Sequence, residues 1–136
     1  MADVRAISQK YAEIGRKVIE KEEELADIKV SSATIVYLSS EHKKMSEGKV
    51  VHAQCEKVAD KHKWAISADY TITVFEPNVE RMTEEQLYIL LFHELMHIEI
   101  GMDDNGKELY KIKGHDLEDF KLIIDRFGTD WAKAGE

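Results

Sequence analysis

The feature that most constrains this chain is an apolar segment that carries ionisable residues. Residues 87–100 are apolar on almost every face of a helix, which predicts a buried helix. His93, Glu94 and His97 interrupt it in the pattern H-E-x-x-H. Such side chains cost free energy inside a protein unless they are paired or bind a metal. The segment therefore predicts a metal site in a small core, and the alternative is two hydrogen-bonded core histidines with an ion-paired Glu94.

The spacing of these residues has a mechanical reason. Two histidines four residues apart project from one side of a helix, so both imidazoles can bind one Zn²⁺ at about 2.0–2.1 Å. Glu94 lies beside that position and not on it, where its carboxylate can take a proton from a metal-bound water. We therefore predict His93 and His97 as zinc ligands and Glu94 as the catalytic acid/base.

A catalytic zinc needs a third protein ligand and one open position. The metzincin spacing would require glycine at position 100 and histidine at position 103, but the chain has Ile100 and Asp103. His115 is the favoured third ligand, because it opens the predicted last helix, which can pack antiparallel to the first ligand helix. The rival ligands are nearby carboxylates: Asp116, Glu118 and Asp119. If His115 is the ligand, Asp116 or Asp119 would orient a ligand imidazole.

Periodicity predicts the elements around this helix. Residues 4–28 have apolar residues at helical spacing, interrupted by Lys21, and predict one amphipathic helix. Strands are predicted at 34–38 and 70–75 and, more weakly, at 50–55, because residues 54–59 could also be helical. Pro77 and Asn78 indicate a turn, and the loop 103–106 precedes a last helix over 116–127.

The boundaries of the buried helix are predicted by local signals. Thr83 and Gln86 form a capping-box pattern at its start, and Gly101 is a plausible end, so we expect a helix over 84–100. The fold class is therefore α+β, with a small sheet of three to four strands.

Composition excludes several classes. The 136 residues favour one domain over 1–136, and the net charge of −8 argues against nucleic acid and anionic membranes as partners. Cys55 is the only cysteine, which excludes an internal disulfide and a thiolate-rich zinc site. No apolar run is long enough to cross a bilayer. We expect a soluble cytoplasmic protein, with a monomer favoured.

Several segments together resemble a known family. Glu76-Pro77-Asn78, the run over 90–98 and the later Gly114-His115-Asp116 run over 114–120 look like the putative phage metallopeptidase family. The resemblance is clearest from residue 49 to 127. It implies a zincin-like domain in which His93, His97 and His115 bind zinc and Glu94 is the acid/base.

The sequence leaves some roles open. The strand over 70–75 is either the edge strand that pairs with an extended peptide, as in zincins, or a plain core strand. Three side chains could stabilise the oxyanion of peptide hydrolysis: Tyr70, Arg81 and Tyr110. A second metal site built on His52, Cys55 and His62 is disfavoured because these residues form no close pair at a ligand spacing.

The predicted function is hydrolysis of peptide bonds in a peptide or protein substrate by a zinc-dependent metallopeptidase. Two alternatives remain: a zinc-binding regulatory or interaction module with little catalysis, and a metal-dependent amidase acting on a non-protein substrate.

Overall fold

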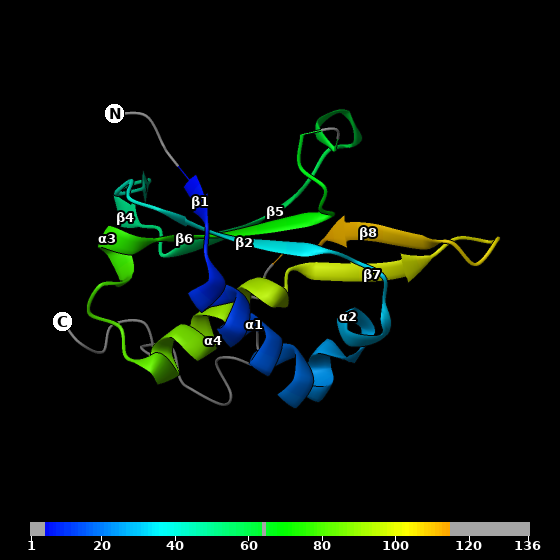
Figure 1. Ribbon diagram of the computed structural model, residues 1–136, viewed down its shortest axis with the longest axis horizontal. Coiled ribbons are helices and arrows are strands. Elements are labelled where there is room, and N and C mark those ends of the chain that lie inside the picture. Colours follow the sequence, from blue (N-terminus) through cyan, green and yellow to red (C-terminus); the bar gives the residue numbers. More distant parts are fainter. Residues whose placement is uncertain (1–4, 64, 115–136) are drawn as a thin grey trace.

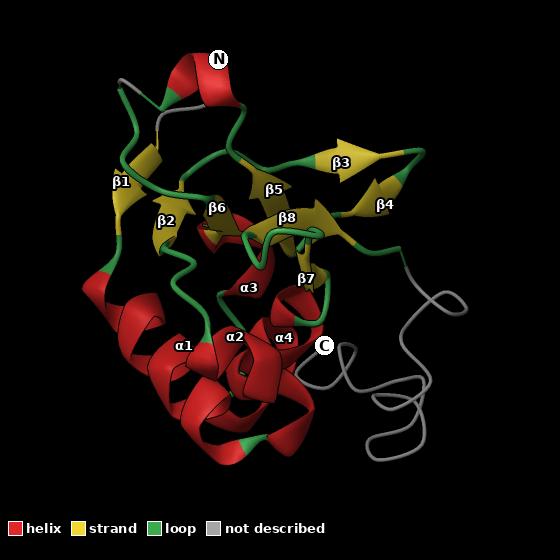
Figure 2. Ribbon diagram, turned by 90° about the vertical axis from the view of Figure 1, so that its right-hand side faces the viewer, coloured by secondary structure: helices red, strands yellow, loops and turns green. Residues whose placement is uncertain are grey.

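The protein has one layer of helices packed on one face of a sheet. The structure, a computed structural model, describes residues 5–63 and 65–114. Figure 1 shows α1 (Gln9–Lys21) and α4 (Glu84–Leu95) on the same side of the strands, and Figure 2 shows the two layers from the side. This mixed architecture is that of an α+β fold.

The main sheet has four strands in the order β1, β2, β6, β5. Their bounds are Arg5–Ile7 for β1, Ile35–Ser40 for β2, Ala53–Lys57 for β5 and Tyr70–Phe75 for β6. β2 and β6 are parallel, with Ile35 opposite Tyr70, and the other two pairs are antiparallel. β6 is therefore central and β5 is an edge strand. The prediction that residues 70–75 could be the substrate-pairing edge is wrong, and the alternative of a core strand holds.

The alternation along β6 explains its central place. Tyr70, Ile72 and Val74 are fully buried in the cluster that the helices cover. Thr73 and Phe75 face the other side, where Arg5 donates a hydrogen bond of 2.9 Å to the Thr73 hydroxyl. A strand buried on both faces cannot lie at an exposed edge without losing this packing.

The predicted helix over 4–28 is wrong as one continuous element. The chain forms β1, then α1, then a short 3₁₀ turn over Glu23–Leu25, then α2 (Ala26–Val30). Ser8 caps α1, because its hydroxyl accepts from the Tyr11 N–H at 3.2 Å. Glu22 ends α1 with extended backbone, and its carboxylate accepts a hydrogen bond of 2.5 Å from the hydroxyl of Tyr88 on α4. Local periodicity cannot predict such a contact with a residue that is distant in the sequence.

The buried helix begins as predicted but ends five residues early. Thr83 and Gln86 form both hydrogen bonds of the capping box. The helix ends at Leu95, so the predicted continuation to residue 100 is wrong. Residues Ile98–Met102 form strand β7 instead, which pairs antiparallel with β8 (Glu108–Ile112). The loop predicted at 103–106 is the turn of this hairpin.

Small elements complete the described chain. A hairpin of β3 (Met45–Ser46) and β4 (Lys49–Val50) precedes β5, a 3₁₀ turn covers Asp60–His62, and the predicted turn at Pro77 is a short helix, α3 (Glu76–Val79). The predicted last helix over 116–127 lies outside the described residues. No helix in the described ranges has both the length and the apolar character needed to span a membrane.

Candidate metal-binding site

The H-E-x-x-H residues lie at the C-terminal end of α4. His93 and Glu94 are in the last helical turn. The chain then tightens, because the His97 N–H donates to the Glu94 carbonyl at 3.1 Å, an i to i+3 bond of the 3₁₀ type. His97 therefore lies at the junction between α4 and β7, and the predicted i, i+4 pair spans a helix end.

His93, Glu94 and His97 lie together. One ligand atom from each lies within 4.8 Å of the others. The two imidazole rings are edge to face, with centroids 5.3 Å apart, and His93 Nε2 lies 3.7 Å from Glu94 Oε2. Within residues 5–63 and 65–114 this is the one group of three or more such side chains close enough to hold an ion. The predicted pair of histidines and its glutamate are thus brought to one place.

The imidazole of His97 is oriented by the backbone. Its Nδ1 lies 2.7 Å from the carbonyl oxygen of Lys113. A carbonyl oxygen only accepts, so Nδ1 carries the proton and the lone pair of a neutral imidazole is on Nε2. This is the arrangement that metal-binding histidines use, because the second nitrogen is then available to a cation. The residues present therefore fit a divalent metal.

Glu94 is buried against the sheet. It is 5% exposed, and α4 packs on β5, where Cys55 pairs with Ile72 and so shares its helix-covered face. Burial raises the pKa of the Cys55 thiol, and the negative charges of Glu94 and Glu56 raise it further. The thiol stays protonated at neutral pH, which makes Cys55 a poor nucleophile and a poor metal ligand.

The proposed third ligand is not placed. His115 and the rival carboxylates Asp116, Glu118 and Asp119 lie outside the described residues. Lys113, two residues before His115, is described, and its N–H also donates to the His97 carbonyl at 2.6 Å. The chain is therefore beside His97 at Lys113, two residues before the first of these candidate ligands in the sequence.

The three oxyanion candidates have different surroundings. Tyr70 is fully buried, and its hydroxyl donates to the Lys111 carbonyl at 2.9 Å, so it has a structural partner instead. The Tyr110 hydroxyl donates to Glu108 at 2.6 Å, and this hydrogen bond raises the pKa of Tyr110 to about 12. Arg81 is exposed.

Lys113 and the hairpin that carries it were missed from the sequence. The signal was present: Asn105-Gly106 is a strong hairpin turn pair, with alternating apolar residues on both sides. The observed loop is longer than the two-residue turn of that pattern, because Met102 pairs with Glu108, and Gly106 adopts a positive φ of 80° within it.

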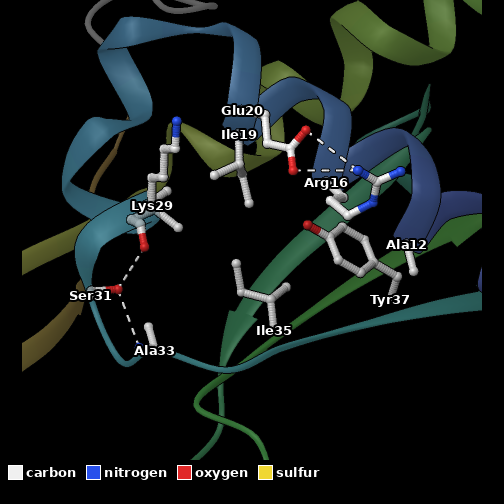
Figure 3. A pocket seen from close by; sticks show the side chains of 10 residues that line it. Ala12, Arg16, Ile19, Glu20, Lys29, Ser31, Ala33, Ile35 and Tyr37 are labelled. Atoms are coloured by element: carbon white, nitrogen blue, oxygen red, sulfur yellow. Dashed lines mark hydrogen bonds and ion pairs between the residues drawn. The ribbon is translucent and has the colours of Figure 1, made fainter.

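A cavity of about 380 Å³ lies elsewhere in the fold, between α1, α2 and β2 (Figure 3). Its walls include Arg16, Ile19, Ile35 and Tyr37, and none of the H-E-x-x-H residues lines it. It is therefore separate from the His-Glu-His cluster.

Comparison with known proteins places the chain in a family. The family model for the putative phage metallopeptidases matches residues 5–136. The chain belongs to that family. The predicted resemblance is confirmed, and it extends over nearly the whole chain and not only residues 49–127. The chain matches no curated protein and no solved structure. The family description implies a metal ion and a protein or peptide substrate.

Proposed function

We propose that this chain is a zinc-dependent metallopeptidase in which His93, His97 and His115 bind the metal and Glu94 is the general acid/base. The observation that carries the proposal is the His-Glu-His cluster at the end of α4, in a chain that belongs to a metallopeptidase family. Two imidazoles close together with a carboxylate beside them are part of the arrangement that a catalytic zinc site uses, and a third protein ligand is still needed.

His115 completes the ligand set in this proposal. Lys113 makes two hydrogen bonds to His97, and His115 follows it by two residues in the sequence. A histidine is also the ligand type that the family resemblance implies at this position.

The chemistry assigned to each residue follows from its surroundings. When bound, zinc lowers the pKa of a coordinated water and polarises the scissile carbonyl. Glu94 takes a proton from the attacking water and returns it to the leaving amine, and its burial keeps bulk water from competing for that proton. His97, held by Lys113, keeps its Nε2 directed away from the backbone.

The edge of the sheet supports a peptide as substrate. β5 pairs with β6 alone among the described strands, and α4 packs against it. An extended peptide can add to such an edge through main-chain hydrogen bonds. We therefore propose that β5, and not the strand over residues 70–75, pairs with an extended peptide substrate.

The test uses metal analysis and a proteome-derived peptide library. Wild type should hold about one zinc per chain, and His93→Ala should lose most of it, whereas His62→Ala, which removes an exposed histidine, should not. Glu94→Gln should keep zinc and lose about 10²–10⁴-fold in rate. Glu85→Gln, an exposed position on the same helix, is the matched control.

The outcomes separate the alternatives. Folded wild type without metal would overturn the proposal. Zinc binding with no cleavage of any peptide would overturn the peptidase and leave the binding module and the amidase, and full activity in Glu94→Gln would remove Glu94 from the mechanism.

A further inference from the structure

The β7–β8 hairpin closes on His97. The strands themselves pair as far as Ile98 opposite Ile112. His97 and Lys113 form one further pair beyond them, because the Lys113 N–H donates to the His97 carbonyl at 2.6 Å. The Lys113 carbonyl then accepts from His97 Nδ1 at 2.7 Å. Both main-chain groups of Lys113 therefore bond to His97, one to its backbone and one to its ring.

One tyrosine ties this hairpin to the main sheet. The Tyr70 hydroxyl, on central strand β6, donates to the Lys111 carbonyl at 2.9 Å and lies 3.4 Å from the Glu99 carbonyl. Glu99 and Lys111 are directly paired across the hairpin, so one buried hydroxyl contacts both strands. The Tyr70 ring also meets the Tyr110 ring edge on, at 6.0 Å between centroids. Lys111 is two residues from Lys113, close to the pair that holds His97.

We propose that the β7–β8 hairpin orients the His97 imidazole, and that Tyr70 is a positioning residue that holds the hairpin in its register. The register of β8 decides which carbonyl meets Nδ1, because a slip by one residue turns every side chain and every carbonyl of a strand the other way. This inference rests on the proposed function only in taking His97 as a metal ligand. The same pairing places Lys113 beside His97, two residues before residue 115 in the sequence.

The tip of the hairpin has no such role. Asp103 holds the turn through its side chain, which accepts from the N–H groups of Asn105 and Lys107 at 2.9 Å each. These contacts are exposed and local. A change of length at the tip leaves the pairs nearer His97 in place, whereas the same change inside β8 displaces Lys113.

The first test compares two single-glycine insertions. One is placed between Asp104 and Asn105 in the turn, and the other between Lys111 and Ile112 in β8. Co²⁺ affinity is measured from the absorption of the bound ion, and circular dichroism reports the fold. The turn insertion should change affinity by less than about 3-fold, and the strand insertion should weaken it about 10–100-fold, as loss of an outer-shell partner does.

The second test avoids a variant that fails to fold. Tyr70→Phe removes only the hydroxyl and should lower Co²⁺ affinity by about 10-fold. Tyr110→Phe is the matched control, because it removes the other hydroxyl of the same aromatic pair, which donates to Glu108 and not to a hairpin carbonyl among the described contacts. The ¹⁵N signals of His97 in metal-free protein at alkaline pH should show one tautomer, with the proton on Nδ1, in wild type and Tyr110→Phe, and a mixture in Tyr70→Phe.

The outcomes distinguish this inference from the proposed function. If wild type binds metal and Tyr70→Phe matches it in affinity and in tautomer, the positioning role is wrong and the peptidase proposal stands. If wild type binds no metal, the peptidase proposal fails and the tautomer alone decides: a mixture confined to Tyr70→Phe supports the positioning role, and identical spectra overturn it.

Discussion

Gly15 lies where α1 crosses β2, and replacing it tests how closely these elements pack. A Cβ added at Gly15 would lie 2.5 Å from Cε2 of Tyr37 and closer still to its Cζ and hydroxyl oxygen. Non-bonded carbons are most stable at about 3.5–4.0 Å, so the Tyr37 ring would have to move by about 1 Å. Tyr37 is 7% exposed and lines the cavity of about 380 Å³ beside α1, so its ring can shift toward that space only by giving up its close packing against α1.

The two effects of Gly15→Ala oppose one another. Overpacking costs about 1–3 kcal/mol, and a clash with two ring carbons and the hydroxyl oxygen places this case near the upper end. Alanine is favoured over glycine inside a helix by about 1 kcal/mol. The net expectation is a loss of about 2 kcal/mol in the free energy of unfolding, measured by urea denaturation followed by circular dichroism.

A control and a compensating change sharpen this prediction. Gly101→Ala, whose added Cβ meets nothing nearer than Leu109 at 3.9 Å, should change stability by less than about 0.5 kcal/mol. Combining Gly15→Ala with Tyr37→Leu should cost less than the sum of the two single changes, because the shorter side chain removes the clash. A Gly15→Ala variant as stable as wild type, or more stable, would refute the reasoning.

Three further outcomes follow from other contacts. Thr83→Ala should lose about 1 kcal/mol in urea unfolding, because it removes the hydroxyl of the capping box that starts α4. Tyr37→Phe should leave the free energy of unfolding unchanged or raise it, since the buried Tyr37 hydroxyl has no hydrogen-bond partner among the described residues; a loss above about 1 kcal/mol would show that it has one. Stability should fall as pH rises above about 8.5, because burial raises the pKa values of Cys55 and Tyr70 in the folded state. The unfolded chain then releases these protons first, which favours unfolding, and urea curves at pH 8 and pH 10 measure the difference.

Local patterns predicted the parts of the fold that local forces decide. The alternation in residues 70–75 predicted β6 with its bounds, and the Thr83–Gln86 pattern predicted the start of α4. The H-E-x-x-H pattern predicted the cluster of His93, Glu94 and His97, and the turn after α4 keeps His97 beside the other two although the helix ends at Leu95.

The remaining elements depend on contacts that are distant in sequence. Ile98 and Ile100 are spaced to suit a strand, yet they follow an apolar helix directly, and only the pairing with Tyr110 and Ile112 decides for the strand. The end of α1 depends on Glu22 meeting Tyr88, 66 residues away. The central place of β6 depends on its parallel partner β2, which a single strand's pattern cannot identify.

Among the described strands, none pairs with the outer edge of β5, and this has a consequence for the behaviour of the protein in concentrated solution. An unpaired strand edge that can accept a peptide can equally accept the same strand of another copy, which is a common route to aggregation. The chain carries two countermeasures: charged Glu56 and Lys57 at the end of β5, and a net charge of −8 that makes copies repel one another. The other edge of the sheet, β1, is only three residues long and offers little to pair with. Among the described strands, β5 thus has an edge long enough to pair with another strand, and charge repulsion is what opposes pairing between copies.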